Sequence, residues 1–65
     1  MLKAAIDLQI GDRVLDDQSR GARRYPIVGV RLVEAGPSRG LVELRVQGRG
    51  TWHYAPREKL DVEEP

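Results

Sequence analysis

Apolar and polar residues alternate along most of this chain, which is the pattern of β-strands with one buried and one exposed face. The clearest alternation lies in residues 41–47, LVELRVQ. Because successive side chains of a strand point to opposite sides, Val42, Leu44 and Val46 are predicted to face a core. No segment repeats its apolar residues at helical spacing for long enough to predict an amphipathic helix.

Four other segments carry strand patterns, at residues 14–15, 25–35, 51–55 and 60–64. In the longest of them the alternation predicts two faces, one with Val28, Val30 and Leu32 and the other with Ile27, Gly29, Arg31 and Val33. In the segment 51–55, Trp52 and Tyr54 share one face, so His53 is predicted to lie on the opposite face, at the surface.

Turn-forming residues separate these strands. They comprise a polar loop at 18–24 and two glycine-containing turns, GPSRG at 36–40 and GRG at 48–50. Pro56 predicts a short helical turn, PREKL, before the last strand, because a proline in the first helical turn loses no hydrogen bond.

Five short strands in this order, with one long loop and one helical turn, resemble the SH3-like barrel, in which a half-open sheet curls to hide its edges. Gly29 in mid-strand fits a sharply coiled position. The resemblance predicts an all-β fold and a single domain over residues 1–65, with an ordered core of about 6–63.

Two groups of SH3-like barrels resemble this chain at particular residues. GDRV at 11–14, followed by IVGV at 27–30, resembles the KOW/Tudor-like modules, although Tyr25-Pro26 replaces the glycine of that group. The same spacing is similar to the plasmid type II dihydrofolate reductase, a tetrameric barrel whose pore carries a Val-Gln-Ile-Tyr run. The corresponding run here, 51–54, agrees only at Tyr54, so the resemblance implies oligomerisation through this region and not reductase activity.

Composition limits the chemistry. The chain has 65 residues, no cysteine and one histidine, so disulfides and thiolate metal sites are excluded, and neither a metal nor a cofactor is expected. The absence of an apolar leader or membrane span predicts a cytoplasmic protein without membrane contact. A lone domain of this size is expected to have a free energy of unfolding of roughly 3–5 kcal/mol. This low stability leaves open the alternative that the chain forms an oligomer.

Charge is unevenly distributed. Residues 13–57 contain nine basic and four acidic residues, whereas residues 58–65 contain four acids and one lysine. The basic middle suits an anionic partner. Its sharpest feature is the loop SRGARR, whose arginines are predicted to contact phosphate.

The pair Trp52 and Tyr54 has two interpretations. The rings fill a core that has no phenylalanine, or they form an exposed stacking platform between Arg49 and Arg57. A core role for at least one ring is the favoured interpretation.

No enzyme signature or small-molecule site is found, so the sequence predicts a non-enzymatic binding module. The first hypothesis is nucleic acid, bound through Arg20, Arg23, Arg24, Tyr25, Arg31, Arg49 and Trp52. The alternative is a protein-interaction or self-assembly module. Its exposed apolar residues would be Ile27, Val33 and Leu41, and its arginines would pair with acidic groups such as the DVEE tail. A pore enzyme of the reductase type is a third and weaker hypothesis.

Overall fold

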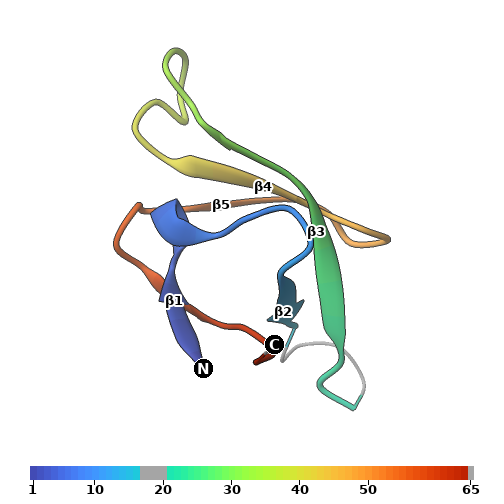
Figure 1. Cartoon of the computed structure of the whole chain (residues 1–65). Helices are drawn as coiled ribbons and strands as arrows, with labels where there is room; N and C mark the ends of the chain where they lie inside the picture. The colour runs from blue at the N-terminus through green and yellow to red at the C-terminus, as the bar shows by residue number, and fades with distance from the viewer. Residues whose placement is uncertain (17–20, 65) are drawn as a thin grey trace.

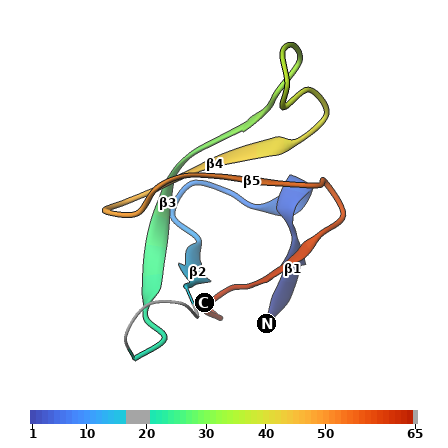
Figure 2. The same ribbon diagram turned by 180° about the vertical axis from the view of Figure 1, so that it is seen from behind.

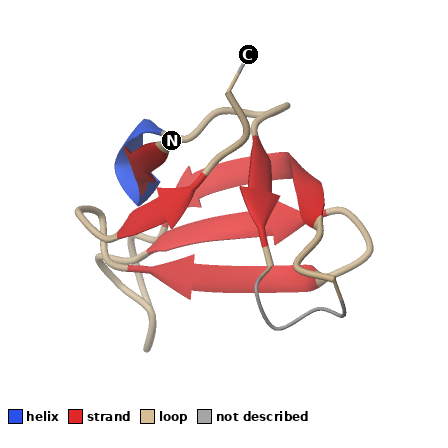
Figure 3. Cartoon of the chain, turned by 90° about the horizontal axis from the view of Figure 1, so that it is seen from below, coloured by secondary structure: helices blue, strands red, loops and turns tan. Residues whose placement is uncertain are grey.

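The computed structural model describes residues 1–16 and 21–64, and regular structure in them is almost entirely β (Figures 1 and 3). The elements in chain order are β1 (Leu2–Ala4), the 3-10 turn η1 (Ala5–Asp7), β2 (Arg13–Leu15), β3 (Arg24–Leu32), β4 (Val42–Val46), β5 (Gly50–Tyr54) and β6 (Lys59–Asp61). The all-β prediction is confirmed. Within these described ranges no helix has the length and apolarity needed to cross a membrane.

The strands form two antiparallel sheets. β1 pairs with β6, and the four-stranded sheet has the order β2-β3-β4-β5. A single bridge between Val14 and Val62 connects the sheets, and the Glu63 N–H donates to the Arg13 carbonyl at 2.8 Å. Figures 1 and 2 show the strands arranged around one interior, with the long β3 curving from β4 towards β2.

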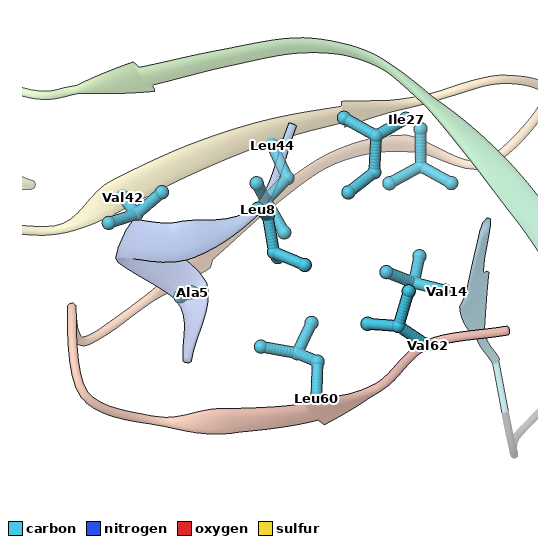
Figure 4. Close-up of a cluster of buried hydrophobic side chains, with 9 residues drawn as sticks. Ala5, Leu8, Val14, Ile27, Val42, Leu44, Leu60 and Val62 are labelled. Carbon is cyan, nitrogen blue, oxygen red and sulfur yellow. The ribbon is translucent and has the colours of Figure 1, made fainter. Parts of the chain in front are cut away.

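The core fills this interior with aliphatic side chains (Figure 4). Val42, Leu44 and Val46 are all buried, so the prediction for residues 41–47 is confirmed. Leu8 and Ala5 from the N-terminal segment and Leu60 and Val62 from the C-terminal segment pack against them, together with Val14 and Ile27. The two ends of the chain therefore contribute to the same core as the central hairpin.

The predicted faces of β3 are wrong at its first half. Ile27 pairs with Val46 and Gly29 pairs with Arg45, so Val28 is an extra residue in a β-bulge. A bulge reverses the alternation, since two residues of one strand then oppose one residue of the other. As a result Ile27 is buried at 1% exposure, whereas Val28, expected to share a face with Val30, is 46% exposed.

The prediction of an exposed apolar surface for a protein-interaction module is also wrong. Ile27 and Val33 are buried, and Leu41 is partly buried. Val33 lies beyond β3, where its N–H donates to the Leu41 carbonyl at 2.9 Å and its carbonyl accepts from Gly40 at 2.9 Å. This turn folds Val33 inwards.

Two further differences concern the chain ends. The residues expected to form a helical turn before the last strand make a reverse turn instead, in which the Glu58 N–H donates to the Ala55 carbonyl at 3.0 Å. The 3-10 turn lies at Ala5–Asp7, and β1 adds a sixth strand outside the range 6–63. β1 has only three residues and Leu2 is exposed, so its pattern carries no strand signal.

Candidate binding surfaces

The structure separates the seven residues predicted to bind nucleic acid. Arg20 lies outside the described residues. The others fall in three places: Arg23, Arg24, Tyr25 and Arg49 near the start of β3, Arg31 near its far end, and Trp52 on the core face of β5. The predicted site is therefore gathered only in part.

Arg49 and Tyr25 are in direct contact. The guanidinium carbon of Arg49 lies 5.2 Å from the centroid of the Tyr25 ring, a cation–π arrangement. Arg49 also pairs with Asp16, whose carboxylate lies 2.8 Å from Nη2 and 3.0 Å from Nε. One face of the Tyr25 ring is thus covered by Arg49 and is not open to a stacking base.

Two of the other predicted arginines, Arg24 and Arg31, also have carboxylate partners within the chain. Arg24 pairs with Asp61 at 3.0 Å, and Arg31 pairs with Glu43 at 2.6 Å. The acidic tail, predicted to meet the arginines of a partner, pairs within its own chain through Asp61 and through Glu63, which lies 3.1 Å from Arg13. Sequence analysis missed these pairs because Arg24 and Asp61 are 37 residues apart.

Trp52 and Tyr54 face the core side of the sheet. They lie opposite Leu44 and Val42, and both rings are partly buried against the core. The ring centroids are 6.4 Å apart at 81°, an edge-to-face contact. The predicted core role is supported for both rings, although each keeps part of its surface exposed.

The opposite surface of β3–β5, here called the outer face, is made by Gly29, Arg31, Glu43, Arg45, Thr51 and His53. His53 is exposed there, as predicted, and its Nε2 lies 3.2 Å from Glu43 Oε1. The hydrogen bond from Arg31 lowers the pKa of Glu43, and the bond from His53 adds to this effect. Glu43 is therefore held ionised between two basic side chains.

A shallow hollow of about 340 Å³ lies at one border of the outer face, next to Ile10, Val28, Gly29 and Arg45. Ile10 is 71% exposed and Val28 is 46% exposed. The Gly11 N–H donates to the Ile27 carbonyl at 2.9 Å, which brings Ile10 next to β3. Sequence analysis missed this surface because alternation alone placed Val28 in the core.

The strand edges differ in how they are protected. Among the described strands, β5 pairs only with β4, so its other edge has no strand partner. β1, β2 and β6 also pair with one strand each, but each has three residues, and β1 and β6 contain Lys3 and Lys59. Short strands and lysine are two means by which proteins protect an edge from further pairing.

Comparisons with protein-family models, with curated proteins and with solved structures found no match for this chain. In the part of the chain that the structure describes, no group of three or more His, Cys, Asp or Glu side chains is placed to hold a metal ion. The surfaces described above are therefore the features from which a function is inferred.

Proposed function

We propose that this chain is a non-enzymatic protein-interaction module, an SH3-like barrel of the cytoplasm that self-associates through the outer edge of β5. The observation that carries the proposal is the pairing of β5 with β4 alone among the described strands. An edge strand presents a row of backbone donors and acceptors to any strand that approaches it. A second copy of β5 is such a strand.

β5 is better suited to this role than β1, β2 and β6, the other described strands that pair with one strand each. It has five residues against three in each of those, and its sequence GTWHY contains neither lysine nor proline. Antiparallel pairing of two β5 strands about a twofold axis would make the same contacts on both copies. The pairing would also cover exposed parts of Trp52 and Tyr54, which adds apolar burial to a small domain.

Sedimentation equilibrium of the purified protein over a wide concentration range tests the proposal. We expect a monomer–dimer equilibrium that Thr51→Lys weakens by about tenfold or more, because an edge lysine opposes strand pairing. Gln47→Lys is the matched control, since it adds the same charge in the exposed turn next to β5 and should leave the association unchanged. A protein that stays monomeric at millimolar concentration, or an equal effect of both substitutions, would overturn the proposal.

Nucleic-acid binding is the second candidate, and it is favoured by one observation. Arg49 lies over Tyr25 near the start of β3, where the exposed Arg23 precedes the strand and the partly exposed Arg24 begins it. Arg24 pairs with Asp61 and Arg49 with Asp16, and both arginine side chains stay partly exposed. Exposed ion pairs contribute only about 0–1 kcal/mol, so a phosphate that reaches these arginines competes with a weakly held carboxylate.

Fluorescence anisotropy with a labelled single-stranded oligonucleotide at several salt concentrations tests this candidate. Binding through phosphate contacts predicts that log K falls linearly with log salt, and that Arg49→Gln reduces the slope by about one. Arg39→Gln, in the turn at the other end of β3, is the control. Salt-independent binding, or equal slopes for the two variants, would refute a phosphate site at Arg49.

A further inference from the structure

Arg45 is a cation on the outer face that its neighbours do not neutralise. Glu43 lies two residues before Arg45 on β4, and both of its oxygens are engaged by other groups: Oε2 by Arg31 at 2.6 Å, and Oε1 by His53 at 3.2 Å and more weakly by Arg31 at 3.4 Å. Within residues 1–16 and 21–64, no acidic side chain forms an ion pair with Arg45. The guanidinium of Arg45 is thus available to an external anion.

Gly29 positions this guanidinium. The Arg45 side chain lies across Gly29 so closely that a Cβ added there would be 2.6 Å from Nε and 2.9 Å from Nη2. A larger residue at position 29 would force the guanidinium to move. Glycine therefore lets the arginine lie flat along the sheet instead of extending into solvent.

The hollow beside Arg45 has an aliphatic side. Ile10 and Val28 both border it and are among the most exposed aliphatic residues of the described chain. Val30, Arg31 and Glu43 also line the hollow, and there Arg31 and Glu43 pair with each other. One hollow thus offers a planar cation at one side and an apolar surface at the other.

We propose that this hollow binds a polypeptide segment in which an aliphatic side chain adjoins an aspartate or glutamate. The carboxylate would bind the fork of Arg45, whose planar geometry matches a carboxylate. The aliphatic side chain would cover Ile10 and Val28 and remove their surface from water. This site lies on a sheet face, so it goes beyond self-association through β5 and can succeed or fail independently of it.

Charge complementarity selects a carboxylate-bearing polypeptide as the occupant. Arg31 is already paired, so a single cation is free on this border of the outer face, and one carboxylate is sufficient to neutralise it. The apolar half of the hollow disfavours a hydrated polyanion, because a phosphate backbone supplies no aliphatic group to cover Ile10 and Val28.

NMR titration of isotope-labelled protein with the peptide Ac-Gly-Leu-Glu-Gly-NH₂ tests the proposal, with Ac-Gly-Leu-Gln-Gly-NH₂ as the control ligand. We expect saturable shifts of the Arg45 Nε–H and Val28 methyl signals with the Glu peptide, and a response at least several-fold weaker with the Gln peptide. An equal response to both peptides, or an equal response to inorganic phosphate, would overturn the proposal.

Protein variants identify the residue that binds the carboxylate of the peptide. Arg45→Gln should abolish the response, Arg45→Lys should weaken it several-fold, and Gly29→Ala should weaken it while retaining the charge. Arg39→Gln, which removes an exposed arginine of the β3–β4 turn, should leave it unchanged. Retained binding in a folded Arg45→Gln protein would refute the assignment. The peptide response should be the same at protein concentrations below and above the midpoint of self-association, which distinguishes this site from pairing through β5.

Discussion

Each core side chain of this protein contributes a large share of the buried apolar surface, because the chain has no phenylalanine and its aromatic rings are only partly buried. The largest fully buried side chains are aliphatic: Ile27, Leu44, Val14, Val42 and Val62. Loss of any one of them leaves a cavity that few neighbours can fill.

Leu44→Ala is predicted to unfold most of the protein. Removal of a buried leucine side chain costs about 2–5 kcal/mol, which matches the roughly 3–5 kcal/mol expected for the whole domain. Urea unfolding followed by circular dichroism measures the change. Leu32→Ala, at 48% exposure on the neighbouring strand, is the control and should cost less than about 1 kcal/mol. Equal losses in the two variants would mean that Leu44 is not central to the core.

At the scale of the element, the β4–β5 turn determines where Arg49 lies. Val46 pairs with Gly50, and the Arg49 N–H donates to the Val46 carbonyl at 3.0 Å. Gly48 within the turn has a φ of 74°, in the left-handed region that residues with a Cβ rarely adopt. This tight turn brings Arg49 over Tyr25.

Gly48→Ala should therefore destabilise the hairpin by about 1 kcal/mol, since an L-residue in the left-handed region costs about 1–2 kcal/mol and alanine also restricts the unfolded chain. Thermal or urea unfolding gives the value. Gln47→Ala, one residue earlier and exposed, should change stability by less than about 0.5 kcal/mol. The prediction fails if the two substitutions have the same effect.

At the scale of the whole molecule, ion pairs connect segments that are far apart in the chain. Arg24 of β3 pairs with Asp61 of β6, and Arg13 of β2 pairs with Glu63 after β6. The hydrogen bond from Arg24 is the main cause that lowers the pKa of Asp61. At Asp12, burial alone would raise the pKa, but hydrogen bonds from the Gln9 N–H and from Lys3 together outweigh it and lower the pKa.

Acid is predicted to destabilise the fold through these carboxylates. The pKa values of Asp61 and Asp12 are lower in the folded state than the ordinary value of about 4, so the contribution of these two carboxylates is complete above that pH and is lost as the pH falls through the lowered values. Urea unfolding at a series of pH values should show this loss. Asp61→Asn should reduce the slope of the unfolding free energy against pH. Glu64→Gln is the control, because it removes an exposed carboxylate that pairs with no described residue. An equal reduction of the slope in this variant would contradict the prediction.

Much of the fold was predictable because its signals are local. Alternation indicated the strands at 41–47 and 51–55, which the structure places at Val42–Val46 and Gly50–Tyr54. The glycines at 48 and 50 indicated the turn between them. The candidate surfaces were less predictable: among the proposed residues that the structure describes, Tyr25 and Arg49 lie in direct contact, whereas Arg31 and Trp52 lie elsewhere on the sheet.

By itself, the sequence determined the all-β class, the inward face of β4 and the surface position of His53, because period-two alternation and turn residues act over a few neighbouring positions. Only the tertiary structure decided which apolar residues of β3 are exposed, because one inserted residue at Val28 reverses the alternation. It also decided which arginines are neutralised, since their carboxylates come from distant strands. Within residues 1–16 and 21–64, Arg45 has no such carboxylate, because Glu43 is already occupied by Arg31 and His53.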